Sequence, residues 1–181
     1  LHAVPGSVLW LLDDNDGARR NLCLEAEARG IVSSRLVFAP RLPLADHLAR
    51  HRAADLFLDS LLCNAHTTTS DALWMGVPVI TCPGTTFAGR VAASLLSAMG
   101  LDELIAATFK DYEALALALA RDPARAAAAK AKLAAHLASV LRGDTALGTR
   151  HLDAAYRTMW GYAQRGLPPA DMIVSAQKTD Y

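Results

Sequence analysis

Residues 55–81 read DLFLDSLLCNAHTTTSDALWMGVPVIT, and this stretch decides the fold. The apolar run at 55–59 is short and bounded by acidic residues, as expected of a buried strand. Residues 67–75 predict a helix that stops at Gly76, because glycine readily takes the left-handed conformation that follows a last helical turn. Residues 77–81 form a second apolar run. The stretch therefore predicts a strand, a helix and a second strand, the repeating unit of a parallel sheet.

The same alternation extends in both directions along the chain. Strands are predicted at 8–12, at 36–38 and, more weakly, around 104–105, and helices at 18–29, 44–53 and 88–99. Short connections between alternating strands and helices are typical of a parallel sheet that is covered on both faces. The predicted fold class is α/β, with a Rossmann-like, doubly wound parallel sheet.

Beyond residue 108 the pattern predicts helices only. Thr108 and Asp122 have the side chains of helix caps, and Pro123 suits a first helical position. The alanine-rich stretch at 124–141 strongly favours a helix. A last helix at 149–165 carries apolar side chains at helical spacing, which we expect to pack on the sheet or on another lobe: Leu152, Tyr156, Met159 and Trp160.

These patterns divide the chain into three parts. Residues 1–108 form the predicted Rossmann-like core, residues 109–166 form helices that pack on it, and residues 167–181 form a tail.

Composition narrows the class of function. The 181 residues are 52% hydrophobic, and their 18 basic and 18 acidic residues balance, so overall charge does not support binding to nucleic acid or to a membrane surface. Three cysteines form no CxxC pair and leave one over from any disulfide, which favours a reduced, cytoplasmic protein. We find no signal peptide or membrane span in the sequence. Because the chain is entering a strand by Ser7, we expect it to be a piece of something longer.

Polar residues gather where the strand at 55–59 gives way to the next helix. In an open α/β sheet, ligands bind beyond the carboxyl ends of the strands, where helix N-termini also point. First-turn amides lack partners within the helix, so together with the hydroxyls of Thr67 and Thr68 they can hold a phosphate or diphosphate. Asp71, one turn further, can accept a hydrogen bond from a ribose hydroxyl. Alternatively, Thr67 only caps the helix and His66 is an ordinary polar loop residue.

Two further clusters favour a ligand site at the same edge. His47 and Arg50 are three residues apart on a predicted helix and share a face, where an imidazole can lie against a base. The alternative for this pair is a solvated helix face. Residues 81–86, TCPGTT, supply glycine and hydroxyl groups at another helix start, with Arg90 on that helix. Three successive strand ends would then carry polar loops at one rim, as in a sugar-nucleotide cleft.

The residues also allow other interpretations. The acidic run at 13–16, DDND, can bind a metal ion, but it more commonly caps the following helix. Cys63 and His66 lack a second pair of zinc ligands, and a cysteine nucleophile needs a geometry that sequence does not show. The acids at 13, 14 and 59, with the strand at 78–81, also suggest a signalling receiver domain, although the expected Lys-Pro pair is absent.

An extended, ordered set of motifs resembles the C-terminal catalytic lobe of the O-linked N-acetylglucosamine transferases, glycosyltransferase family 41. It comprises DSLLCNAHTT at 59–68, DALWMGVPV at 71–79, Pro83-Gly84 and RVAAS at 90–94, with VLWLL at 8–12 and the late Tyr156, Met159 and Trp160. The likeness covers nearly the whole chain. It implies a GT-B architecture of two Rossmann-like lobes, with the sugar donor held mainly by this lobe and with tetratricopeptide repeats upstream.

The resemblance implies roles for residues around the base and the ribose. It places His47 against the uracil, with Arg50 close to it and the backbone near Leu42 at the base edge. Asp71 is placed on the ribose. Leu44 stands where some relatives have a donor-contacting lysine, which is a departure from the family pattern.

The resemblance also implies roles around the diphosphate and the sugar. His66, Thr67 and Thr68 are placed on the diphosphate, and Cys63 lies near the donor sugar. Ala65 replaces a glycine of the family, which is a mild departure.

The activity implied is inverting transfer of N-acetylglucosamine from UDP-N-acetylglucosamine to serine or threonine hydroxyls of proteins, without a metal or other cofactor. The catalytic lysine and histidine of the family belong to segments before Leu1, so this chain alone is expected to bind the donor without turnover. Its partners would be UDP or the UDP sugar, acceptor proteins and the N-terminal lobe. A protein O-fucosyltransferase of the plant SPINDLY type, which uses a GDP sugar, and a non-catalytic sugar-nucleotide-binding relative stay open as alternatives.

Overall fold

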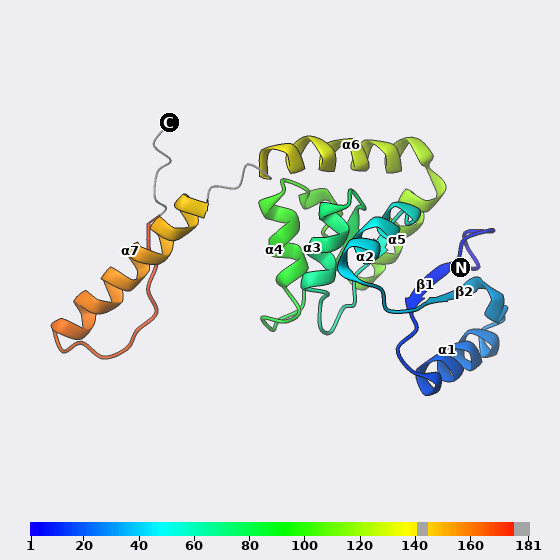
Figure 1. Cartoon of the computed structure of the whole chain (residues 1–181), viewed down its shortest axis with the longest axis horizontal. Coiled ribbons are helices and arrows are strands. Elements are labelled where there is room, and N and C mark those ends of the chain that lie inside the picture. Colours follow the sequence, from blue (N-terminus) through cyan, green and yellow to red (C-terminus); the bar gives the residue numbers. More distant parts are fainter. Residues whose placement is uncertain (141–144, 176–181) are drawn as a thin grey trace. The chain divides into compact units, whose positions relative to one another are not determined.

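The computed structural model describes residues 1–140 and 145–175 of the chain (Figure 1). The chain divides into two compact units, Leu1–Ala138 and Ser139–Tyr181. The strands of the described residues lie in the first unit, and the second contains the last helix. Parallel strands joined by helices make the fold α/β, as predicted.

The first two strands pair directly with each other. β1 (Leu9–Leu12) and β2 (Leu36–Ala39) run parallel, with Leu9 opposite Leu36. α1 (Asp16–Ala28) and the short η1 (Ser33–Arg35) connect them, and Figure 1 shows α1 beside this pair.

The acidic run after β1 caps a helix. The Asn15 side chain accepts a hydrogen bond from the Ala18 amide at 2.7 Å, which satisfies one of the free first-turn amides of α1. Asp13 pairs with Arg19 and Asp14 pairs with Arg41, at 2.8 and 2.6 Å. The helix-cap interpretation of this run is therefore confirmed, and its flanking acids are neutralised by arginines.

The stretch at 55–81 forms the predicted strand, helix and strand. β3 (Phe57–Leu58) and β4 (Val79–Ile80) are parallel, and α3 (Thr67–Trp74) connects them. Gly76 follows α3 with a φ of 79°, in the left-handed region that glycine favours. The hydrophobic core includes residues of α3 and β4, and its fully buried members include Ala72, Val79, Ile80, Leu96 and Leu101.

The predicted continuous sheet is only partly present as hydrogen-bonded ladders. The strands pair as β1–β2 and β3–β4, and a single bridge joins Thr81 to Ile105. Leu104, predicted to be in a strand, belongs to η3 (Asp102–Leu104). β4 is short because Pro78 has no N–H to donate, so the ladder cannot extend through it on that side.

Two predicted helices have different bounds in the structure. The helix expected at 44–53 divides into α2 (Leu44–Arg50) and η2 (His51–Ala53). α4 (Val91–Ala98) begins three residues later than predicted, and Arg90 is its N-cap rather than a helical residue. The preceding loop closes on itself instead, because the Gly84 amide donates to the Gly89 carbonyl at 2.7 Å.

The later helices begin at the predicted caps. The Thr108 hydroxyl accepts from the Asp111 amide at the start of α5 (Phe109–Arg121). Asp122 accepts from the amides of Ala124 and Arg125 at the start of α6 (Pro123–Val140). Leu119 of α5 and Leu133 of α6 are buried in the core of the first unit.

The last helix, α7 (Thr145–Gln164), begins four residues earlier than predicted. Its apolar stripe is between 43% and 66% exposed, so the expected packing of that stripe stays a prediction. Residues 167–175 contain no helix or strand, whereas Leu141 of the alanine-rich stretch and the end of the predicted tail fall outside the described residues. No helix in the described ranges is both long and apolar enough to cross a membrane.

Candidate functional site

A hollow at the carboxyl ends of the strands brings several predicted residues together. Its volume is about 350 Å³, within the range of roughly 300–1,000 Å³ that is usual for small-molecule sites. The lining residues come from the end of β1, the segment after β2, α2 and the first turn of α3: Leu12, Arg41, Leu42, Leu44, His47, Arg50 and Thr68. Four of these residues, Leu42, His47, Arg50 and Thr68, were predicted to bind a nucleotide.

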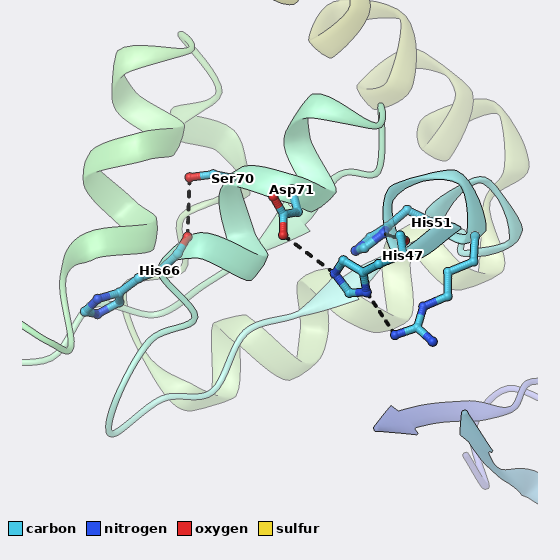
Figure 2. Close-up of polar contacts among 6 residues, drawn as sticks. His47, His51, His66, Ser70 and Asp71 are labelled. Carbon is cyan, nitrogen blue, oxygen red and sulfur yellow. Dashed lines mark hydrogen bonds and ion pairs between the residues drawn. The ribbon is translucent and has the colours of Figure 1, made fainter. Parts of the chain in front are cut away.

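His47 is the centre of the polar contacts at this hollow. Its Nε2 lies 3.6 Å from Oδ2 of Asp71 on α3, and its Nδ1 lies 2.9 Å from the guanidinium of Arg50 (Figure 2). The His47 and Asp71 side chains are 25% and 20% exposed, so both stay within reach of a ligand. The predicted shared face of His47 and Arg50 is confirmed.

Its surroundings favour the neutral form of this imidazole. Burial lowers the pKa of His47 below its ordinary value of 6.5, and the nearby His51 and Arg50 lower it further. Asp71 opposes this shift in pKa but does not reverse it. A neutral ring loses less hydration energy on being covered than a charged ring does. It is therefore suited to lie against a flat, uncharged group such as a base.

The first turn of α3 has amides without partners inside the helix. The N-cap is His66, and its side chain makes no capping hydrogen bond. Thr67 is the first helical residue, so the alternative in which it caps the helix is wrong. Thr67 and Thr68 are exposed, whereas Thr69 is fully buried against the core. Two of the three threonines are therefore available, next to amides that attract an anion.

His66 and Cys63 do not line the hollow. Figure 2 shows His66 at the start of α3, with its ring directed away from His47 and Asp71. The His66 ring contacts the loop before α4 instead, with Nε2 at 3.4 Å from the Ala88 carbonyl. Cys63 is exposed on the preceding loop. The structure thus separates these two predicted residues from those that line the hollow.

The third polar stretch, residues 81–86, also lies apart from the hollow. Thr81 is buried, and the Thr86 hydroxyl accepts from the Gly89 amide at 3.1 Å within its own loop. These hydroxyl groups hold the loop and are not directed to the hollow. Only two of the three expected strand-end clusters contribute to its lining.

Sequence reasoning missed the side chains that fix the loop beneath α3. Asp59 is 3% exposed, and its two carboxylate oxygens accept from the Ala65 amide at 2.7 Å and the Thr81 hydroxyl at 2.6 Å. Asn64 donates to the Ser60 carbonyl and accepts from the Ala92 amide. For Asp59, its position directly after β3 was the available sign of such a role.

Three lining or neighbouring residues were also missed. Arg41 and Leu12 line the hollow, and His51 lies edge-on to His47 with 4.8 Å between ring centroids. His51 follows His47 by four residues, so helical spacing alone could have linked them.

A second hollow, of about 190 Å³, lies beside η3, α5 and α6. None of the residues predicted to bind a ligand lines it. No cluster of three or more His, Cys, Asp or Glu side chains with metal-binding geometry occurs among the described residues.

Comparison with known proteins identifies the family. The sequence profile described as Glycosyl transferase family 41 matches residues 1–144. The chain belongs to glycosyl transferase family 41. The resemblance seen in the sequence is thereby confirmed, and the receiver-domain alternative is excluded. The buried Asp59, with both carboxylate oxygens engaged, also lacks the accessibility of a phospho-acceptor.

Individual family 41 proteins match most or all of this chain. It is 36% identical over 184 residues to the UDP-N-acetylglucosamine–peptide N-acetylglucosaminyltransferase of Caenorhabditis elegans, covering 100% of the chain and 16% of that protein. It is 35% identical over 170 residues to a probable UDP-N-acetylglucosamine–peptide N-acetylglucosaminyltransferase of Arabidopsis thaliana, SEC, covering 93% of the chain and 17% of that protein.

A solved family 41 structure has the same fold. An O-GlcNAc transferase mutant of Thermobaculum terrenum superposes with a TM-score of 0.83 at 36% identity, covering 88% of this chain and 31% of that one. The predicted Rossmann-like lobe is confirmed by this match. The chain spans a small part of each relative, 16% or 17% of the curated proteins and 31% of the solved chain.

Proposed function

We propose that this chain is the donor-binding lobe of an enzyme that transfers N-acetylglucosamine from UDP-N-acetylglucosamine to serine or threonine hydroxyls of proteins, with inversion. The observation that carries the proposal is the hollow, where Leu42, His47, Arg50 and Thr68 meet beside Asp71. The relatives in Caenorhabditis elegans and Arabidopsis thaliana, named as UDP-N-acetylglucosamine–peptide N-acetylglucosaminyltransferases, support the choice of sugar and acceptor.

The base and the ribose suit the α2 side of the hollow. The neutral His47 ring offers a flat face, and Leu12, Leu42 and Leu44 supply apolar walls. Asp71, one turn into α3, accepts from a ribose hydroxyl through the carboxylate oxygen that His47 does not approach.

The diphosphate suits the start of α3. The free amides of the first turn carry partial positive charge. The hydroxyls of Thr67 and Thr68 can donate hydrogen bonds to the same anion. During transfer, the bond between the anomeric carbon and the diphosphate oxygen breaks, and negative charge develops on that oxygen. Amides that are fixed in place before the reaction stabilise this charge without reorganisation and without a metal ion.

The rest of the reaction needs segments outside this chain. We infer that the longer protein supplies the second lobe, the catalytic groups and the surface that binds the acceptor protein, since the relatives are much longer than this chain. His66 and Cys63, which lie outside the hollow, are then assigned to the side of the diphosphate and the sugar.

Isothermal titration with UDP, GDP and ADP in the presence of EDTA tests the proposal. UDP should bind best, and Asp71→Ala and the double change Thr67→Ala/Thr68→Ala should each weaken binding by about 1–3 kcal/mol. Ser70→Ala is the matched control, because Ser70 is on α3 but does not line the hollow. A preference for GDP would favour a fucose donor instead, and equal affinity in all variants would remove the assignment of these residues.

A further inference from the structure

A chain of contacts behind the hollow restrains the orientation of His47. The Arg50 guanidinium lies over the Trp10 ring of β1, with 5.4 Å from its carbon to the ring centroid. Arg50 also donates to the Pro40 carbonyl at 2.6 Å and contacts His47 Nδ1 at 2.9 Å. Stacking and two hydrogen bonds leave this long side chain little rotational freedom.

The contact with Arg50 determines which ring nitrogen of His47 carries the proton. A guanidinium has donors only, so Nδ1 of His47 must accept and must be unprotonated. The neutral ring then carries its proton on Nε2, the nitrogen that lies 3.6 Å from the Asp71 carboxylate. Each nitrogen therefore faces a group of matching polarity.

His51 provides an internal contrast one helical turn away. Its Nδ1 lies 2.8 Å from the His47 carbonyl, which can only accept, so His51 carries its proton on Nδ1. The two rings are nearly perpendicular, at 89°, and the Trp10 ring lies 6.5 Å from His51. The structure thus assigns opposite tautomers to His47 and His51, and of these two rings only that of His51 is in contact with the Trp10 ring among the described residues.

We propose that Arg50 and Trp10 are positioning residues that hold His47 as the Nε2–H tautomer, with both ring nitrogens engaged and only the ring faces left for a nucleotide base. The second part of this inference rests on the proposed function. The charged and titratable groups around the ring are Arg50 on its own helix, His51 on η2, Asp71 on α3 and Arg41 at the edge of the hollow. These groups keep the ring neutral near pH 7, since the pKa of His47 is lowered.

Long-range ¹⁵N–¹H NMR of the histidine rings tests the first part without any ligand. At about pH 8, above the ordinary histidine pKa, His47 should show the Nε2–H tautomer and His51 the Nδ1–H tautomer. Finding His47 as the Nδ1–H tautomer in the unmodified chain would overturn the inference, whatever happens in the variants.

Variants test the positioning roles. Arg50→Met should give a mixture of His47 tautomers and raise the pKa of His47, because a donor and a positive charge are lost. Trp10→Leu should do the same to a smaller degree, and Trp10→Phe should restore the wild-type spectrum, since a ring face is regained. Arg52→Met, which changes an exposed arginine of η2, is the control. An unchanged His47 spectrum in folded Arg50→Met would overturn the role of Arg50.

Titration with UDP then separates this inference from the proposed function. Arg50→Met and Trp10→Leu should weaken UDP binding by about fivefold, and Arg52→Met should not. Absence of UDP binding with the expected His47 tautomer would contradict the proposed function and leave the tautomer assignment supported. Tight UDP binding with His47 as the Nδ1–H tautomer would support the proposed function and contradict the tautomer assignment.

Discussion

Two groups of polar side chains follow the strands of this chain, and they differ in what they contact. The rim network consists of the buried Asp59, Asn64 and Thr81 and the half-buried Tyr112. Their side chains hydrogen-bond to backbone groups and to one another inside the first unit. The polar residues of the hollow, His47, Arg50 and Thr68, with Asp71 beside them, are exposed or half-buried, and the first three line open space. The first group holds the loop on which α3 begins, and the second group is left for a ligand.

The difference teaches how to divide a polar motif into structural and binding residues. Removing one partner of a buried hydrogen bond leaves the other unsatisfied, which costs about 1–3 kcal/mol for each group. A half-exposed side chain can exchange its partner for water, so its removal costs little stability. The two groups should therefore separate cleanly when stability and nucleotide affinity are measured on the same variants.

Asp59→Ala should have the largest effect on stability. It leaves the Thr81 hydroxyl and the Ala65 amide without their buried acceptor, and we expect the free energy of unfolding to fall by about 3 kcal/mol. Urea unfolding measures the change. Asp55→Ala is the matched control, because the Asp55 side chain is 99% exposed and pairs only loosely with Lys130, at 3.5 Å. Equal losses of stability in Asp59→Ala and Asp55→Ala would contradict the structural role given to the rim network.

Asn64→Ala should destabilise the chain by about 2 kcal/mol. The substitution removes a donor to the Ser60 carbonyl and an acceptor for the Ala92 amide in the first turn of α4. Thermal or urea unfolding measures the loss, and Asn21→Ala on the exposed face of α1 serves as the control. An unchanged free energy of unfolding in Asn64→Ala would mean that α4 does not depend on the hydrogen bond from the Ala92 amide to Asn64.

Tyr112→Phe should cost about 1 kcal/mol, because the phenol donates to the Asp59 carbonyl at 2.9 Å. Burial, helped by Asp59 and Cys82, also raises the pKa of Tyr112 from 10.0 to about 12. The folded state favours the neutral phenol, so this stabilisation is complete below pH 10 and is lost as pH rises toward 12. Unfolding measured across that interval should show the loss in the wild type and a flatter profile in Tyr112→Phe.

Thr68→Ala should have the smallest effect on stability, within about 0.5 kcal/mol, because this threonine is exposed. Its affinity for UDP should nevertheless fall by about fivefold, through loss of one hydrogen bond to the diphosphate. Measuring both quantities on one preparation sharpens the contrast with Asp59→Ala. A large loss of stability with unchanged UDP affinity would place Thr68 among the structural residues.

The sequence predicted the order of helices and strands well, with errors at their ends. Apolar runs and helix caps such as Thr108 and Asp122 are local features, so their positions could be read directly. The start of α4 was missed because the Gly84–Gly89 hydrogen bond closes the loop before it. The extent of the sheet was overestimated, since ladders depend on partners far apart in the chain.

The candidate site was predicted in part. Leu42, His47, Arg50 and Thr68 lie around one hollow and Asp71 lies beside it, as expected from strand ends and helix spacing. Thr67 and Thr68 are exposed and Thr69 is buried. The sequence could not predict this difference, because all three residues are threonines and their burial depends on how α3 packs on the core.

The sequence by itself determined the α/β class, the family and several of the residues that line the hollow, because periodicity, helix caps and ordered motifs are local features of the chain. Only the tertiary structure decided which polar groups are buried in the rim network and which stay open at the hollow. It also decided the tautomers of His47 and His51, because a proton's position depends on which donor or acceptor the fold brings to each nitrogen.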